Sequence, residues 1–499
     1  MEPKSIIIAG AGIAGLSAGC YGQMNGYRTQ IFERHDVPGG LCTSWKRKGY
    51  TIDGCLHWLV GSRPGDNFHR IWEELGAVQG RPMIDHEEFL RVEGKEGKVF
   101  IVYCDIDRLR QHMKELAPQD SPVIEELTRA ARTCARYDLP VDKAPELYGT
   151  IDGCLFLIRT FPFLRLMSKW KNISVQDYAQ RFSDPFLREA LPWISGLPDF
   201  PMAGLLMILA WMHRKSAGYP VGGSLEFSRS IERRYLDLGG EIHYHSPVAR
   251  VIVENDQAVG VRLADGTEHR SDITISAADG HATIFDMLGG EYINDRIRGY
   301  YDNLPIFPPL IHVALGVHRS FEKMPATVIY PLGESVTIGG RQQDHFGVEI
   351  CNFDPTQAPP GKTVLKVMFT ADYAYWKNLR QDPERYKAEK EKIADQVISL
   401  LNQHYPGLAG QVEMRDVATP MTWERYTGNW QGSMEGWLFT KKTFPPFRMS
   451  KTLPGLKSFY MAGQWVEPGG GVPTAAMSGR NVMQLICKRD RRTFVAKTP

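Results

Sequence analysis

A glycine-rich turn near the N-terminus constrains this chain more than any other part of its sequence. Residues 6–8 are three isoleucines and predict a buried parallel strand, and the pattern G-x-G-x-x-G follows directly at residues 10–15. A helix is predicted from Leu16 to Met24. Strand, glycine turn and helix in this order are typical of a dinucleotide-binding unit, in which the helix N-terminus offers N–H donors to a pyrophosphate.

The next segment indicates which dinucleotide is bound. A second strand is predicted from Tyr27 to Phe32, and Glu33 follows where a carboxylate can accept both hydroxyls of an adenosine ribose. An acid there favours a 2′-hydroxyl over a 2′-phosphate. The paired glycines Gly39 and Gly40 then bring further backbone N–H groups against a longer dinucleotide, which favours FAD over NAD.

Two further segments complete the predicted nucleotide fold. Ser458 to Ala462 is a predicted strand, and a glycine-rich loop at 469–471 opens a helix with Pro473 in its first turn. Such a helix N-terminus would stabilise the negative charge that develops on a flavin during reduction. Residues 248–279 predict a hairpin-containing sheet that returns to the nucleotide fold.

These segments resemble the flavin amine oxidase and phytoene desaturase superfamily, nearest to its branch of phytoene desaturases, carotene cis-trans isomerases and retinol saturases. Further segments carry the resemblance: Tyr219–Ser224, Ala277–Asp279, Ala418–Pro420 and Thr427–Asn429. The resemblance implies an α/β chain with a Rossmann-type FAD-binding domain of three-layer ββα form and an α+β substrate domain built from insertions. It also implies that the backbone of Val248 holds the adenine and that residues 471–474 lie against the flavin.

Two positions depart from the family pattern. Gln464 stands where an acidic residue usually binds the ribityl chain, and it still offers hydrogen bonds without charge. Leu41 and Cys42 stand where many amine oxidases have an arginine, so backbone donors must hold that phosphate. The expected FAD contacts are Gly10, Gly12, Ile13, Ala14, Gly15, Glu33, Arg34, Gly40, Leu41, Val248, Gly463, Gln464, Gly471, Val472 and Thr474.

The expected domains are discontinuous. The FAD-binding domain is predicted from residues 1–90, 220–290 and 440–499, and the substrate domain from 91–219 and 291–439. The sequence contains no second G-x-G-x-x-G motif, so we expect no separate nicotinamide-binding domain.

Three residues are candidates for catalysis. By the resemblance, the segment 53–61 passes beside the flavin ring and places His57 and Trp58 there. His57 is the candidate acid or base, with a structural histidine bonded to a carbonyl as the alternative. Tyr426 is a second-rank candidate that aromatic core packing explains nearly as well. No metal site is expected.

Charge and cysteine content limit the partners and the compartment. The chain of 499 residues has 59 Lys and Arg against 57 Asp and Glu, so no overall field indicates nucleic acid as a partner. The eight cysteines form no C-x-x-C motif, which favours free thiols in a reducing compartment and a cytoplasmic location.

Two apolar runs bear on the substrate. Phe156–Met167 and Ala203–Met212 are each shorter than the roughly 20 residues that span a bilayer. They predict either buried core helices or the lining of a tunnel that admits a lipid from a membrane surface. The basic run Lys488–Arg492 could add attraction to anionic lipid, or it is a solvated helix end.

The first functional hypothesis is an FAD-dependent oxidoreductase that removes or adds hydrogen across a carbon–carbon bond of a long apolar polyene, isoprenoid or related lipid. Its rivals are a redox-neutral cis-trans isomerase that uses reduced FAD, and a flavin amine oxidase. A degenerate flavoprotein that only binds lipid is a fourth reading, against which the intact glycines and Glu33 count. The expected partner is a small apolar substrate, with peripheral membrane contact.

Overall fold

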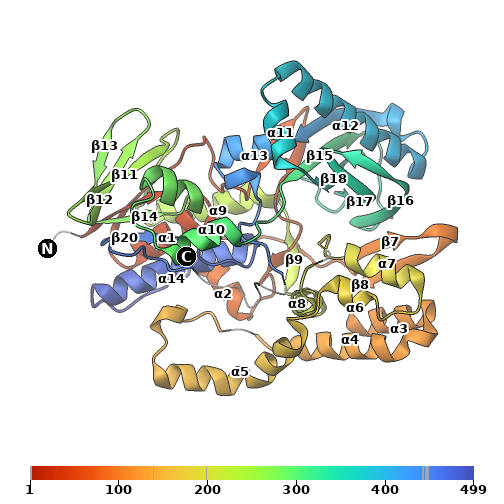
Figure 1. The fold of residues 1–499 in the computed structure, drawn as a ribbon, viewed down its shortest axis with the longest axis horizontal. Coiled ribbons are helices and arrows are strands. Elements are labelled where there is room, and N and C mark those ends of the chain that lie inside the picture. The colour runs from red at the N-terminus through yellow and green to blue at the C-terminus, as the bar shows by residue number, and fades with distance from the viewer. Residues whose placement is uncertain (1–2, 139, 198, 441–442, 444–448) are drawn as a thin grey trace.

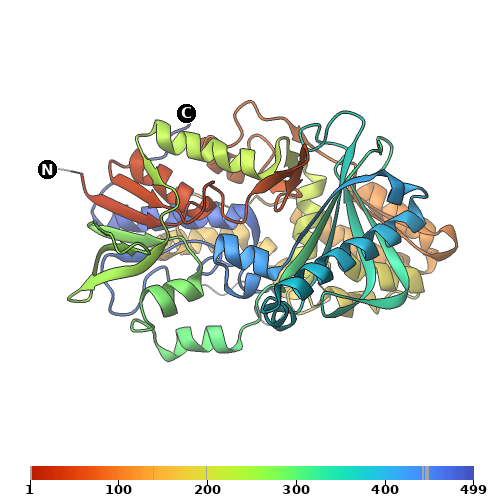
Figure 2. The ribbon, with the colours of Figure 1, turned by 90° about the horizontal axis from the view of Figure 1, so that it is seen from above.

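The computed structural model describes residues 3–138, 140–197, 199–440, 443 and 449–499. A sheet at each end of the long axis organises the chain, with helices packed around both (Figure 1). Seen from above, the N-terminal strands and the C-terminal helix lie together at one end, and the larger sheet lies at the other (Figure 2).

The first sheet is parallel and has the order β10-β2-β1-β14-β20. Its central strand β1 pairs with β2 and β14, and residues 6–8 are buried on both faces, as its isoleucines predict. Strands from the two ends and the middle of the chain thus build one Rossmann-type sheet, which confirms the expected fold class. The strands are β1 (Ser5–Ala9), β2 (Arg28–Phe32), β10 (Glu241–His243), β14 (Ile273–Ser276) and β20 (Phe459–Met461).

Helix α1 (Ile13–Met24) begins three residues before the Leu16 predicted from sequence. The last residues of the glycine motif therefore form its first turn. Small residues let neighbouring backbones approach: a Cβ at Gly15 would lie 2.0 Å from the carbonyl oxygen of Gly10. A Cβ at Gly479 of α14 (Gly471–Arg489) would lie 2.3 Å from the carbonyl oxygen of Ala14, so α14 packs closely against α1.

The middle segment forms the hairpin-containing sheet that the sequence predicts. Strands β11 (Val248–Glu254), β12 (Gln257–Leu263) and β13 (Glu268–Arg270) are antiparallel, and the chain then enters β14. Helices α2 (Asn67–Glu74) and α9 (Gly223–Asp237) complete this part of the molecule, with the short strands β3 (Ser44–Arg47), β4 (Tyr50–Asp53), β5 (Leu59–Val60), β6 (Met83–Ile84) and β9 (Ala217–Pro220).

The second sheet has seven strands in the order β19-β15-β18-β17-β16-β7-β8. Helix α12 (Pro383–His404) buries Ile393, Val397 and Leu401 in the same hydrophobic cluster as strands of this sheet. The expected domain boundaries stay a prediction. The strands are β7 (Glu88–Glu93), β8 (Val99–Tyr103), β15 (Leu310–Val317), β16 (Thr327–Ile338), β17 (Arg341–Ile350), β18 (Thr363–Thr370) and β19 (Val412–Ala418). Helices α11 (Tyr373–Leu379) and α13 (Pro420–Thr427) lie near this sheet, whereas α10 (Asp295–Asn303) packs with Phe459 and Met461 of β20.

A helical region covers the lower part of the molecule in Figure 1. Its helices are α3 (Ile106–Leu116), α4 (Ser121–Cys134), α5 (Thr150–Trp170), α6 (Val175–Ala179), α7 (Pro185–Trp193) and α8 (Met202–His213). The two apolar runs behave differently here. Most of α8 is buried in the core of this region, which favours the core-helix alternative for Ala203–Met212, and a tunnel lined by this run stays a prediction. Helix α5 exposes much of its apolar surface.

Candidate active site

One cavity of about 360 Å³ lies where the glycine turn, the start of α14 and the second sheet meet. We call it the flavin cavity. Among its lining residues are thirteen of the expected FAD contacts: Gly10, Gly12, Ile13, Ala14, Glu33, Arg34, Gly40, Leu41, Val248, Gly463, Gln464, Gly471 and Val472. Segments that are hundreds of residues apart in sequence therefore line one space, although their contacts with FAD stay a prediction.

The glycines of the turn leave room for a pyrophosphate. Among the described residues other than its two chain neighbours, the atom nearest to a Cβ added at Gly12 would be the carbonyl oxygen of Gly39 at 4.0 Å, so its backbone borders open space. Gly15 does not line the flavin cavity and instead allows the tight turn onto Gly10. The N-terminus of α1 thus borders a backbone-lined cradle, which fits the phosphates of FAD.

Glu33 follows β2 at the rim of this cradle. Its Oε2 accepts a hydrogen bond from Ala11 N at 2.6 Å, and its Oε1 accepts one from His35 N at 2.8 Å. Each carboxylate oxygen has a second lone pair for a ligand hydroxyl. The backbone bonds hold the side chain in the cavity wall, as ribose recognition requires.

Replacing Glu33 with Gln should weaken FAD retention by about ten- to a hundredfold, since a hydrogen bond to a charged group contributes about 1.5–3 kcal/mol. The measurement is the dissociation constant of FAD, obtained by titrating the apoprotein and following flavin fluorescence. The control Glu268→Gln removes a carboxylate from the exposed strand β13 and should leave FAD affinity unchanged. Equal affinities for all three proteins would refute the role of Glu33.

The start of α14 places backbone groups at the other end of the cavity. Gly471 and Val472 line it, but Thr474 does not. The Thr474 hydroxyl donates to the carbonyl oxygens of Gly470 and Gly471, at 2.9 and 3.1 Å, so it stabilises the first turn of the helix.

The three catalytic candidates lie in different surroundings. His57 and Tyr426 line the flavin cavity, and Trp58 does not. The Trp58 ring packs against Trp211 of α8 with centroids 6.3 Å apart. Tyr426 is 45% exposed, and its ring meets that of His35 edge-on at the rim. His57 is therefore the candidate best placed for proton transfer.

His57 is held by a charged pair from the second sheet. Its Nδ1 lies 2.7 Å from Oε2 of Glu349 on β17, and the same oxygen lies 3.0 Å from Nζ of Lys366 on β18. Burial alone would raise the pKa of Glu349, but the charges of Lys366 and His57 outweigh it and hold that pKa well below its usual range. Burial alone would lower the pKa of Lys366, but Glu349 raises it overall.

Sequence reasoning missed Glu349 and Lys366, although each interrupts an apolar strand. A charged residue between Val348 and Ile350, or between Leu365 and Val367, is a signal for a buried pair.

A third missed residue, Glu435, also lines the flavin cavity. A Cβ at Gly470 would lie 2.2 Å from its Oε2, which places the carboxyl beside the start of α14. Burial raises the pKa of Glu435 to about 7, against an opposing effect of His57. A carboxyl that titrates near neutral pH is suited to proton transfer. No sequence motif marks this position.

The raised pKa of Glu435 predicts a pH-dependent stability. The folded protein holds this proton more tightly than the unfolded chain, so the stabilisation is complete below pH 4.5 and is lost as the pH rises through about 7. The loss should reach about 3 kcal/mol. Urea unfolding between pH 5 and about 8 should show this decline in the wild-type protein. The Glu435→Gln variant should show a smaller decline, and identical pH profiles would contradict the assignment.

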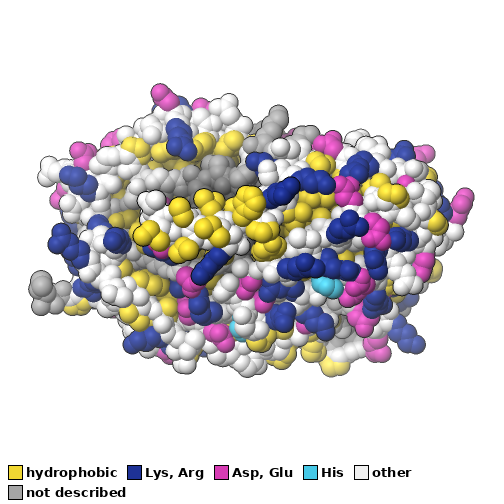
Figure 3. All heavy atoms as spheres, turned by 90° about the horizontal axis from the view of Figure 1, so that it is seen from below, with side chains coloured by type: hydrophobic (Ala, Val, Ile, Leu, Met, Phe, Trp, Pro, Cys, Tyr) yellow, Lys and Arg dark blue, Asp and Glu magenta, His cyan; other side chains and the backbone are white. Residues whose placement is uncertain are grey.

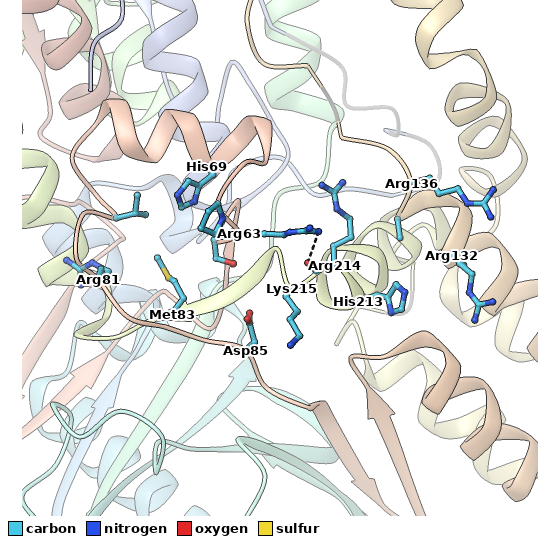
Figure 4. Close-up of a pocket in the computed structure, with 14 residues that line it drawn as sticks. Arg63, His69, Arg81, Met83, Asp85, Arg132, Arg136, His213, Arg214 and Lys215 are labelled. Atoms are coloured by element: carbon cyan, nitrogen blue, oxygen red, sulfur yellow. Dashed lines mark hydrogen bonds between the residues drawn. The ribbon is translucent and has the colours of Figure 1, made fainter. Parts of the chain in front are cut away.

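A second cavity, of about 880 Å³, opens between α2, α4 and α8, and none of the described residues lines both it and the flavin cavity (Figure 4). Several of its cations are already engaged. Arg214 pairs with Asp66 at 2.6 Å, and Arg132 pairs with Asp107. In Figure 4 the side chains of Arg136 and Lys215 extend in different directions, so they offer no common binding point. We assign this cavity no ligand.

The profile of one protein family, flavin containing amine oxidoreductase, matches residues 13–487. The chain belongs to this family. It is an FAD-dependent oxidoreductase of the flavin amine oxidase and phytoene desaturase superfamily, as the sequence motifs predict.

Curated relatives match nearly the whole chain. A lycopene-forming phytoene desaturase of Pseudescherichia vulneris is 23% identical, covering 97% of this chain and 99% of its own. A chloroplastic prolycopene isomerase of Daucus carota is 25% identical, covering 95% of this chain and 78% of its own.

Solved structures share the fold. An oxidoreductase of Methanosarcina mazei has a TM-score of 0.60 at 19% identity, covering 96% of this chain and 100% of its own. Cyclohexylamine oxidase of Brevibacterium oxydans has a TM-score of 0.59 at 14% identity, covering 98% and 100%. At such identities the structural likeness supports the fold alone.

Proposed function

We propose that the protein transfers hydrogen to or from a carbon–carbon bond of a long apolar polyene or related isoprenoid lipid. The observation that carries the proposal is the match over nearly the whole chain to phytoene desaturases and prolycopene isomerases. The cavity supports it: Leu310 of β15, Met368 of β18 and Met434 give its wall an apolar part on the side of the second sheet.

The chain's residues position the reactants and handle protons. When bound, FAD supplies the group that accepts or donates a hydride. The cradle around Gly12 and Glu33 holds the nucleotide end, and the start of α14 offers backbone N–H donors to the flavin end. Leu310 and Met368 exclude water beside the substrate carbons. His57 and Glu435 line the same space and can accept the proton that leaves with the hydride.

Anaerobic flavin reduction tests this proposal against its rivals. Phytoene in detergent should bleach the bound oxidised flavin, and cyclohexylamine and putrescine should not. A wild-type protein that is bleached by an amine and not by phytoene would be an amine oxidase. A protein that converts prolycopene only after its flavin has been reduced, without net oxidation of that flavin, would be an isomerase.

Helix α5 supports access from a membrane. Ile151, Leu155, Ile158 and Phe161 recur at helical spacing on one face and are exposed, Ile158 to 72% and Phe161 to 62%. In the C-terminal half of the helix the opposite side, with Phe163, Met167 and Trp170, is buried. Figure 3 shows apolar side chains gathered on the underside of the molecule with Lys and Arg side chains beside them. We propose that this face rests on a bilayer, from which an apolar substrate enters.

Among the described residues, no helix combines the length and the hydropathy needed to cross a bilayer. Contact through the α5 face would therefore be peripheral. The cytoplasmic location stays a prediction.

Replacing Leu155, Ile158 and Phe161 together with Gln should lower binding to liposomes by about tenfold or more, because each side chain loses favourable apolar burial. Phe163 is left unchanged because it packs against Tyr137 in the core. The control Leu236→Gln changes an exposed apolar residue on α9. Co-sedimentation with liposomes at low salt is the measurement, and equal binding of variant and control would exclude α5 as the contact.

A further inference from the structure

A buried ion pair lies directly behind the candidate proton-transfer residue of the flavin cavity. The side chain of Lys366 is 1% exposed and that of Glu349 is 9% exposed, whereas that of His57 is 39% exposed. Lys366 and Glu349 thus lie in the interior of the second sheet, and His57, which contacts Glu349, lies at the wall of the flavin cavity. Burying two charges is costly unless each is paired and hydrogen-bonded.

The contacts of His57 are one-sided. Its Nδ1 lies 2.7 Å from Glu349 Oε2, and within the described part of the chain no protein atom forms a hydrogen bond with its Nε2. Since an ionised carboxylate only accepts hydrogen bonds, Nδ1 must carry the proton of that contact. The neutral imidazole then has a free lone pair at Nε2, on the ring edge not engaged with Glu349.

Lys366 determines whether Glu349 is ionised and so accepts a hydrogen bond from Nδ1 of His57. Nζ of Lys366 lies 3.0 Å from Oε2 of Glu349 and 3.4 Å from the carbonyl oxygen of Asp53. Without this cation a buried carboxyl would tend to take up a proton, because burial disfavours its charge. A protonated Glu349 could donate to Nδ1 and shift the imidazole proton to Nε2.

The other titratable groups near His57 do not replace this contact. His312 on β15 is buried and near Lys366, and burial lowers its pKa to about 3, so it stays neutral. Both its ring nitrogens lack a hydrogen-bond partner in the described part of the chain. Glu435 lies on the cavity side and interacts with His57 only through its charge. Glu349 is therefore the group that sets the orientation of the ring.

We infer that Glu349 and Lys366 are positioning residues that fix His57 in the Nδ1–H tautomer and leave Nε2 as the proton acceptor of the reaction. The inference rests on the proposed function in taking His57 as the proton-transfer residue. In the reaction one substrate carbon would lose a proton to Nε2 while its neighbour loses a hydride to the bound FAD, so that a double bond forms between the two carbons, and Glu349 would stabilise the imidazolium.

The tautomer can be measured without any substrate. In holoprotein labelled with ¹⁵N-histidine, the His57 signals are those absent from the His57→Gln spectrum. We expect the wild-type protein to show a protonated Nδ1 and an unprotonated Nε2 at neutral pH. In Lys366→Met the proton should move to Nε2, and in Lys366→Arg, which keeps the charge, it should stay on Nδ1. Lys362→Met removes an exposed lysine of the neighbouring turn and should change nothing.

The Glu349→Gln variant is a second test of the His57 tautomer, and it does not depend on replacing Lys366. The amide can either accept from or donate to Nδ1, so both tautomers should appear. The rate of flavin reduction should fall at least tenfold with KM and FAD content unchanged. A wild-type protein with its proton on Nε2, or identical tautomers in Glu349→Gln and wild type, would overturn the inference. If the tautomers behave as expected but phytoene never bleaches the flavin, the proposed function fails while the positioning stands.

Discussion

Replacing Lys366 with Met should lower the free energy of unfolding by about 3–5 kcal/mol, the largest stability change that we expect for a single substitution. Methionine fills a similar volume but leaves Glu349 buried beside His57 without its cation. The charge must then stay uncompensated or be neutralised by a proton, and both cost stability. Urea unfolding monitored by tryptophan fluorescence measures the change.

Two variants show whether the loss of stability in Lys366→Met comes from the broken ion pair or from altered packing. Lys362→Met removes a solvent-exposed ion pair with Glu413 and should leave the free energy of unfolding nearly unchanged. The double variant Glu349→Leu/Lys366→Met removes both charges and should recover most of the loss, because apolar replacements of a buried pair are often neutral. A double variant as unstable as Lys366→Met alone would show that packing dominates.

Replacing His57 with Gln should lower the rate of flavin reduction by about a hundred- to ten-thousandfold, the usual contribution of a positioned acid or base. Glutamine still donates a hydrogen bond to Glu349, so the ion pair keeps a partner and the fold should persist. Rapid mixing of oxidised protein with phytoene under anaerobic conditions measures the rate, and the flavin spectrum before mixing reports FAD content.

The neighbouring Trp58→Phe variant is the matched control. Its ring lies against Trp211 outside the lining of the flavin cavity, so the rate should change by no more than about twofold. A His57→Gln protein that reacts as fast as this control would remove His57 from the proposed mechanism.

The sequence predicted the nucleotide fold because backbone geometry demands particular residues there. Gly10 adopts a φ of +99°, and a side chain at Gly15 would collide with the turn, so few other residues are compatible with this strand–turn–helix unit. Glu33 was predicted from a different signal, a carboxylate directly after the second strand of the unit, and the structure places it directly after β2. The start of α1 was misplaced because the last three residues of the motif, 13–15, form the first helical turn.

The local sequence pattern could not predict which of the two apolar runs is buried, nor which groups contact His57. Residues 156–167 and 203–212 are similarly apolar, yet α8 is enclosed by the helical region while α5 lies across its surface. Glu349 approaches His57 across 292 positions of sequence, through a strand of the second sheet. Such contacts depend on how two sheets are assembled, and periodicity describes only single elements.

Product analysis by mass spectrometry tests the central claim most directly. Oxidised holoprotein incubated with phytoene and a soluble electron acceptor, and reduced holoprotein incubated with lycopene, should yield in at least one case a product that differs by pairs of hydrogen atoms. The number of conjugated double bonds, read from the absorption spectrum, should change with it. Products of unchanged mass from both polyenes, or conversion of cyclohexylamine by the same preparation while both polyenes remain intact, would contradict hydrogen transfer at a carbon–carbon bond.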